Sequence, residues 1–205
     1  ILLQLTACSL EAFPDWMYQS IEVYASTDPQ CAGPQFRWCG RAMEGALSLS
    51  HTDNDACACV SEGSTVGVDL ESVAPRVEAF YRSNYTEAEK QWVNRGASIE
   101  PLSPNWLYTL LWTFKEAALK ARVVLQKNPV SFAGIQVTGL PVPQDVLWAY
   151  RKSNWTHQFG LLAAGIEEER NTTGVHVAYM GTNRLILAVV KPFGCGQKAN
   201  SVVVP

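Results

Sequence analysis

Short runs in which apolar and polar residues alternate mark the first third of the chain. Between residues 46 and 71 the segments ALSLS, ACACV and TVGVDLE are separated by polar turns, and this pattern predicts three strands. Ile21–Tyr24, with the sequence IEVY, predicts another strand. The segment from Ala25 to Gly40 is rich in Pro, Gly, Cys and polar residues, and therefore predicts a loop. The first ten residues have a spacing compatible with a helix.

The middle of the chain has helical spacing instead. Helical stretches are predicted at Val77–Arg82 and at Thr86–Val93. The second stretch begins with a capping box, since the Thr86 side chain can accept from the amide three residues on while Glu89 reaches back. A longer helix is predicted from Pro104 to Leu125, with proline at its start as helices favour.

Strand-like runs return in the last third of the chain, and Gly181-Thr182-Asn183 between the last two predicts a hairpin. The hairpin before the helical middle resembles this later one, as in a duplicated α+β architecture. The tail from Lys191 is expected to be mobile. The predicted strands of this part are Ile135–Val137, Val146–Tyr150, Phe159–Ala164, Val175–Tyr179 and Leu185–Val190.

Composition narrows the class of protein. Of 205 residues 47% are hydrophobic and 17% are charged, which is typical of a globular chain and not of a disordered one. The net charge of -3 does not suggest a nucleic-acid partner. No apolar run approaches the length of a membrane-spanning helix, so no membrane span is expected.

The cysteines favour a reduced, cytoplasmic protein. No C-x-x-C pair occurs among them, and Cys57 and Cys59 are expected to pack as small apolar residues on one face of a strand. Three N-x-T sequons point the other way, but such short patterns arise by chance. The absence of an initiator Met suggests a segment of a larger protein or a trimmed chain. The six cysteines are Cys8, Cys31, Cys39, Cys57, Cys59 and Cys195.

Two polar clusters could meet where a strand ends beside the long helix. Asp69 and Glu71 lie two apart on a predicted strand, so both side chains point to the same side. Trp112, Glu116 and Lys120 lie at i, i+4 and i+8 on one stripe of the helix. Converging carboxylates are what Mg²⁺ requires, and the implied chemistry is on a phosphate ester. The structural alternatives are a solvated Glu–Lys helix pair and a turn cap.

His51 has two interpretations of its own. It ends a predicted strand, a position from which loops present binding groups. Alternatively, it is a turn histidine that Asp53 or Asp55 satisfies.

Four segments in chain order, SLSH, VGVDLE, YTEAE and WTFKEAALKA, resemble the 4′-phosphopantetheinyl transferase superfamily. Its hallmark is a G-[IV]-D-x-E strand followed by W-x-x-K-E-[AS]-x-x-K, and residues 40–125 match well. The chain length is similar to that of the larger, Sfp-like group. That resemblance implies an α+β fold in which two related halves form a pseudo-dimer. The halves would be residues 1–66, truncated at the start, and residues 67–205, which carry the metal motifs.

The resemblance implies a transferase of the holo-acyl-carrier-protein synthase class. Such an enzyme moves the 4′-phosphopantetheine arm of coenzyme A to a serine of an acyl or peptidyl carrier protein and releases 3′,5′-ADP. Carriers of this kind serve fatty acid, polyketide and nonribosomal peptide biosynthesis. By motif position the Mg²⁺ ligands, with Mn²⁺ as a possible substitute, would be Asp69, Glu71 and Glu116.

Further roles follow from the same resemblance. His51 and Lys115 would contact the phosphates of coenzyme A, and Arg41 would be another coenzyme A contact, although Ala42 departs from the G-[KR]-P pattern of the family. Lys120 would bind phosphate or help to deprotonate the serine. Glu89 would be a second candidate base, or only the cap of its helix.

Trp112 is expected to be a packing anchor that fixes the position of Glu116. A non-catalytic domain of the same fold that docks onto carrier proteins is the main alternative, although it gives no reason to keep three mutually repelling carboxylates. A Mg²⁺-dependent phosphoester hydrolase is another, but it leaves the K-E-A-x-x-K helix unexplained.

Overall fold

A computed structural model provides the fold of this chain. Predictions for the first ten residues, for Val146–Tyr150, for the helix beyond Ala121 and for the tail beyond Pro192 lie outside the residues that the structure describes. The described residues are 21–25, 34–38, 40–42, 46–61, 65–99, 102–121, 132–140, 160–168, 171–181 and 184–192.

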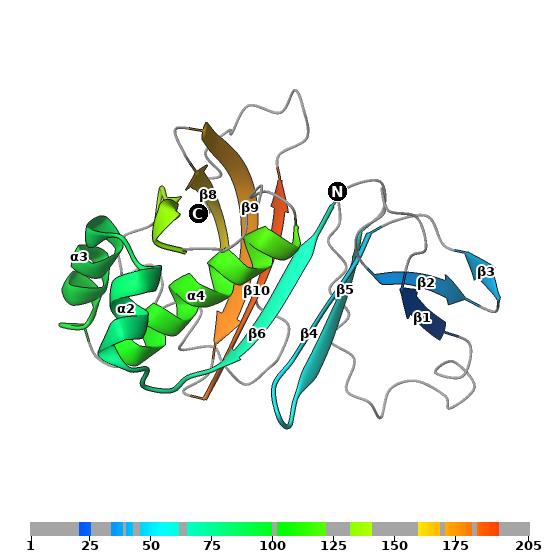
Figure 1. Ribbon diagram of the computed structural model, residues 1–205, viewed down its shortest axis with the longest axis horizontal. Coiled ribbons are helices and arrows are strands. Elements are labelled where there is room, and N and C mark those ends of the chain that lie inside the picture. Colours follow the sequence, from blue (N-terminus) through cyan, green and yellow to red (C-terminus); the bar gives the residue numbers. More distant parts are fainter. Residues whose placement is uncertain are drawn as a thin grey trace.

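A five-stranded antiparallel sheet forms the larger part of the fold (Figure 1). Its order is β6-β10-β9-β8-β7, so that β6, which carries the D-x-E motif, is an edge strand of this sheet. The four strands predicted in the last third of the chain that the structure describes, β7 to β10, are confirmed, as is the TVGVDLE strand, β6. The strands of the sheet are β6 (Gly67–Ser72), β7 (Ile135–Thr138), β8 (Gly160–Glu168), β9 (Asn171–Gly181) and β10 (Leu185–Pro192).

In the described part of the chain, three α-helices follow β6 and lie on one side of the sheet (Figure 1). They are α2 (Glu78–Asn84), α3 (Glu87–Gly96) and α4 (Pro104–Lys120), and a 3-10 turn, η2 (Phe132–Gly134), precedes β7. Proline stands at the start of α4, as predicted, and Ser103 caps it by accepting from the amide of Trp106. In the described part of the chain no helix is both long and apolar enough to cross a membrane.

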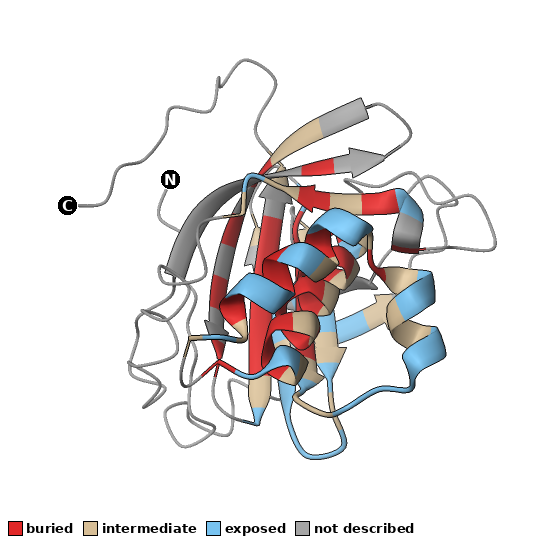
Figure 2. Ribbon diagram, turned by 90° about the vertical axis from the view of Figure 1, so that its left-hand side faces the viewer, coloured by how far each residue is buried: buried red, intermediate tan, exposed pale blue. Residues whose placement is uncertain are grey.

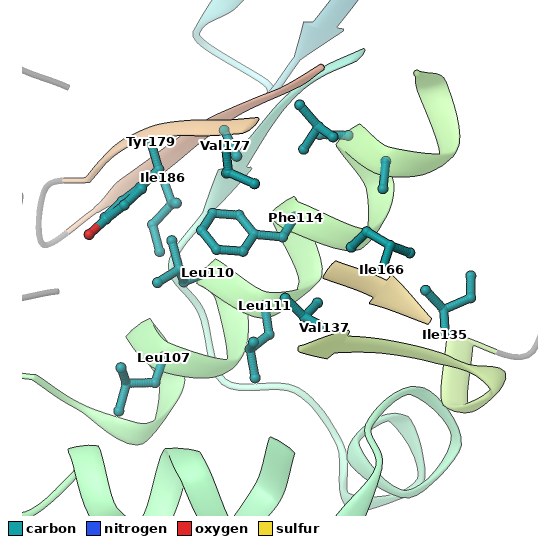
Figure 3. Packing of buried hydrophobic residues seen from close by; sticks show 14 of the residues in the cluster. Leu107, Leu110, Leu111, Phe114, Ile135, Val137, Ile166, Val177, Tyr179 and Ile186 are labelled. Atoms are coloured by element: carbon teal, nitrogen blue, oxygen red, sulfur yellow. The ribbon is translucent and has the colours of Figure 1, made fainter. Parts of the chain in front are cut away.

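The core lies between α4 and the sheet, and the buried face of α4 is turned toward the strands (Figure 2). Leu107, Leu110 and Phe114 project from the helix into this core (Figure 3). The ring of Phe114 meets that of Tyr179 on β9 edge to face, with centroids 5.7 Å apart. Such aromatic contacts add to the hydrophobic burial that holds the helix against the sheet.

Gly67 explains the glycine of the G-x-D-x-E motif. A Cβ at this position would overlap the carbonyl oxygen of Ala117 and lie 2.5 Å from the amide nitrogen of Ala121. The start of β6 therefore touches the backbone of the last turn of α4, and only glycine leaves room for that approach. This contact fixes how far the carboxylates of β6 lie from the side chains of α4.

Two smaller sheets precede β6. The predicted strands IEVY, ALSLS and ACACV are confirmed, whereas the predicted loop between Ala25 and Gly40 is wrong, since β2 lies within it. Ile21 pairs with Trp38, and Ala25 with Pro34. Proline is tolerated there because it is the first residue of its strand. The two sheets comprise β1 (Ile21–Ala25), β2 (Pro34–Trp38) and β3 (Arg41–Ala42), and the pair β4 (Ala46–His51) and β5 (Ala56–Ser61).

Strand β4 lies beside β6 and is joined to it through side chains (Figure 1). The Ser48 hydroxyl accepts a hydrogen bond from the amide of Val68 at 2.9 Å, and the Ser50 hydroxyl accepts one from the amide of Leu70 at 3.1 Å. A second cluster of buried apolar residues packs where these strands meet, and buried Cys59 belongs to this cluster as a small apolar residue. The division at residue 66 and the relation between two halves remain predictions.

Candidate functional site

Asp69 is the most buried carboxylate where β6 meets α4. Lys120 donates to its Oδ1 at 2.6 Å, and the Ser50 hydroxyl donates to the same oxygen at 2.9 Å. Lys120 also donates to the Ser50 oxygen at 3.1 Å. The other carboxylate oxygen, Oδ2, is buried and finds no hydrogen-bond partner among the described residues. A buried carboxylate oxygen without a donor is costly, so this atom points to a ligand that supplies positive charge.

Glu71 is the second carboxylate of β6, and both of its oxygens have donors. The indole of Trp112 donates to Oε1 at 3.1 Å, and Arg76 donates to Oε2 at 3.1 Å. Burial raises the pKa of Glu71, the charge of Asp69 raises it further, and the Trp112 and Arg76 contacts oppose the rise. Trp112 packs against Phe80, as expected of an anchor, but the motif carboxylate to which it donates is Glu71.

Glu116 is half-buried one turn before Lys120. Burial raises the pKa of Glu116, the charges of Asp69 and Glu71 raise it further, and the Lys120 ammonium lowers it. Within the described residues its carboxylate makes no hydrogen bond. The charges of the two strand carboxylates therefore act on Glu116 across the junction of β6 and α4.

These residues fit Mg²⁺ in kind, since all three are hard oxygen donors and one oxygen of Asp69 is buried without a partner. Their side chains are not arranged around one metal position: the described ranges contain no group of three His, Cys, Asp or Glu side chains that could hold a metal ion. The contacts give the reason: Lys120 neutralises Asp69 and Arg76 neutralises Glu71. Metal binding would require Glu71 to give up one of its two donors, whereas Asp69 could offer its unpartnered Oδ2.

Lys115, next to Glu116 in the sequence, lies on a different face of α4 and is fully buried. Its ammonium donates to Glu89 Oε2 at 2.8 Å and to the carbonyls of Asn84 at 2.7 Å and Phe132 at 3.0 Å. Three acceptors match the three N–H bonds of an ammonium group. Burial lowers the pKa of Lys115, and the adjacent Glu89 opposes that shift.

Glu89 is buried to the same degree and serves three backbone and side-chain donors. Its Oε2 accepts from the amide of Thr86, which completes the predicted capping box, and from Lys115. Its Oε1 accepts from the amide of Val137 on β7 at 2.9 Å. The pair Glu89–Lys115 thus ties α3, α4, the end of α2, η2 and β7 together.

The roles expected for these two residues from the resemblance do not agree with this placement. Lys115 has no free N–H and no exposed surface with which to reach a phosphate of coenzyme A. Glu89 has both oxygens engaged in the core and is remote from solvent, which favours the alternative that it is the cap of its helix. The resemblance assigned Lys115 to a phosphate by its position in the motif, which does not reveal that its ammonium is buried.

His51 is exposed at the end of β4, directly after Ser50. The turn that follows it is closed by Thr52, whose hydroxyl accepts from the amides of Asn54 and Asp55. Arg41 begins β3, and its side chain lies outside the described part of the chain. The positions of His51 and Arg41 leave their predicted contacts to coenzyme A as proposals.

Two residues at this site were missed from the sequence. Ser50 bridges Asp69 and Lys120, and the sequence named it only as part of the SLSH segment, without a role of its own. Arg76 contacts Glu71 from the segment between β6 and α2, where no periodicity indicates a direction. Arg76 also lines a narrow aromatic pocket together with Phe80 and Tyr81.

The family comparison agrees with this geometry. A family model, the 4′-phosphopantetheinyl transferase superfamily, matches residues 65–160. This stretch is therefore similar to the 4′-phosphopantetheinyl transferase superfamily. The match begins just before β6 and contains both motif segments and all three carboxylates, so it supports a transferase that acts on phosphopantetheine. A comparison with curated proteins finds no match to the chain.

Proposed function

We propose that this chain transfers the 4′-phosphopantetheine arm of coenzyme A to a serine hydroxyl of an acyl or peptidyl carrier protein and releases 3′,5′-ADP. The observation that carries the proposal is the meeting of β6 and α4. The close approach at Gly67 holds Asp69 and Glu71 beside Glu116 and Lys120. Carboxylates and a lysine at one strand–helix junction suit the binding of a metal and a pyrophosphate.

Asp69, Glu71 and Glu116 would hold the divalent cation, Mg²⁺ or Mn²⁺. When bound, the cation would neutralise charge on the pyrophosphate of coenzyme A and make 3′,5′-ADP a better leaving group. Asp69 is ready for this role through its unpartnered Oδ2. The raised pKa values of Glu71 and Glu116, due first to burial and then to Asp69, reflect mutual repulsion that a cation would relieve.

Lys120 would bind phosphate oxygens of coenzyme A. Its ammonium now donates to Asp69 and Ser50 and is partly exposed, so it can turn to an anion that arrives from solvent. His51 and Arg41 would contribute further contacts to the phosphates. We assign Glu89 and Lys115 to the core and give neither a step in the reaction.

The finer assignments belong to the same proposal. We infer membership of the Sfp-like group, with halves at residues 1–66 and 67–205, and the holo-acyl-carrier-protein synthase activity. The partner would be a carrier protein of fatty acid, polyketide or nonribosomal peptide biosynthesis in the cytoplasm, and the chain could be a domain of a megasynthase.

The test is the intact mass of an apo carrier protein after incubation with this chain, coenzyme A and Mg²⁺. A gain of one phosphopantetheine is expected with the unmodified chain and with Glu87→Ala, which removes an exposed carboxylate of α3. The gain should vanish with Glu116→Ala. No gain with a folded chain and several carriers would instead favour the non-catalytic docking domain.

A further inference from the structure

Arg76 and Lys120 neutralise the two carboxylates of β6 in different surroundings. The Asp69 side chain is only 4% exposed and its partner Lys120 is 31% exposed, whereas Arg76 is 40% exposed and Glu71 is 24% exposed. The Arg76–Glu71 pair is therefore the more open of the two. An exposed ion pair exchanges its partner at low cost, because solvent and salt can replace either charge.

The backbone at Arg76 is anchored independently of its side chain. The Arg76 amide donates to the hydroxyl of Tyr81 at 2.9 Å, and that hydroxyl in turn donates to Asn105. The guanidinium lies over the ring of Phe80, with its central carbon 5.5 Å from the ring centre. The Phe80 ring could thus keep its contact with the guanidinium if Arg76 released Glu71, while the Tyr81 hydroxyl holds the main chain in place.

Glu71 does not depend on Arg76 for its position. Its other oxygen, Oε1, accepts from the indole of Trp112 at 3.1 Å, and Trp112 is fixed by ring contacts to Phe80 and Phe132. The carboxylate would therefore keep its orientation if the guanidinium withdrew. Arg76 therefore contributes positive charge beside Glu71 and does not determine the orientation of the carboxylate.

We propose that Arg76 is a built-in counter-ion for Glu71 that competes with the divalent cation and lowers the affinity of the site for it. This inference rests on the proposed role of Glu71 as a metal ligand, and Arg76 acts only through that carboxylate. Its physical basis is the guanidinium 3.1 Å from Oε2, together with the buried, unpartnered Oδ2 of Asp69, which marks the same strand as a cation site. Arg76 thereby sets the metal concentration at which the site fills.

The test measures Mn²⁺ binding directly, from the electron paramagnetic resonance signal of free Mn²⁺, with no coenzyme A or carrier present. Arg76→Met removes the charge but keeps an apolar stem to cover Phe80. We expect its Kd for Mn²⁺ to be roughly 1.5- to 5-fold lower than that of the unmodified chain, the range that an exposed ion pair provides. Lys90→Met is the matched control, since it breaks an exposed pair with Glu87 and should leave Kd unchanged.

Further variants separate this inference from the proposed function. Glu71→Gln should weaken Mn²⁺ binding, and Arg76→Met should have no further effect in that background. If Glu71→Gln weakens binding but Arg76→Met alone leaves Kd unchanged or raises it, the counter-ion role is refuted while the metal site stands. If Glu71→Gln binds Mn²⁺ as the unmodified chain does, Glu71 is no ligand and both ideas fail. Urea midpoints of each variant confirm that folded protein is compared.

Discussion

Removing the charge of Lys115 should destabilise the whole fold. Lys115→Met leaves the Glu89 carboxylate in the core without its cation, and leaves the carbonyls of Asn84 and Phe132 without donors. Deleting one partner of a buried ion pair costs about 3–5 kcal/mol, because a charge remains buried without compensation. That loss is a large share of the roughly 5–15 kcal/mol by which domains are stable.

A double-mutant cycle measures the coupling free energy between Lys115 and Glu89. Lys115→Met, Glu89→Gln and the double variant are compared by urea unfolding followed by circular dichroism. The double variant should lose less than the sum of the single variants, with a coupling of roughly 2 kcal/mol or more, since the second change removes the charge that the first one stranded. Lys90→Met, which breaks the exposed pair with Glu87, should cost only about 0.5 kcal/mol.

The refuting result is clear for this prediction. If Lys115→Met unfolds at nearly the urea concentration of the unmodified chain but binds coenzyme A far more weakly, then Lys115 is a phosphate ligand. The ion pair would then not be a structural element of the core. A coupling near zero would lead to the same conclusion.

Two further predictions concern single contacts. Gly67→Ala forces a methyl group into the backbone of α4 and should cost about 3 kcal/mol or abolish folding, whereas Gly134→Ala meets open space and should stay within about 0.5 kcal/mol; urea midpoints compare the two. The hydroxyl of Tyr85 donates to the Tyr108 carbonyl, and burial raises the pKa of Tyr85. The folded chain therefore keeps this proton after the unfolded chain releases it above about pH 10, so the free energy of unfolding falls as pH rises further. Tyr85→Phe should lose about 1 kcal/mol at pH 7 but show a smaller alkaline decline, and an equal decline in both proteins would contradict this account.

Those features of the site that depend on residues close together in the sequence were predictable. Period-two alternation put Asp69 and Glu71 on one side of β6, and the helical repeat put Glu116 and Lys120 on one stripe of α4. The capping box at Thr86 was equally local, and the structure confirms both of its hydrogen bonds. In each case the residues that decide the geometry lie within a few positions of one another.

The parts that depend on distant partners were not predictable. Lys115 is buried because Glu89 and two carbonyls from separate segments surround it, and its own neighbours in the sequence do not reveal them. Strand β2 was assigned to a loop because Pro34 and the surrounding polar residues favour turns, while its pairing with β1 outweighs that preference.

The serine hydroxyls of β4 also bear on aggregation. Strand β6 is an edge of the five-stranded sheet, and an edge with free amides is a template for pairing with another chain. Ser48 and Ser50 accept from two successive outward amides of β6, those of Val68 and Leu70, without making β4 a sixth strand of that sheet. The edge that carries Asp69 and Glu71 is thus shielded from intermolecular strand pairing by the two serine side chains of β4. The same Ser50 hydroxyl donates to Oδ1 of Asp69 and leaves Oδ2 of that carboxylate without a partner among the described residues.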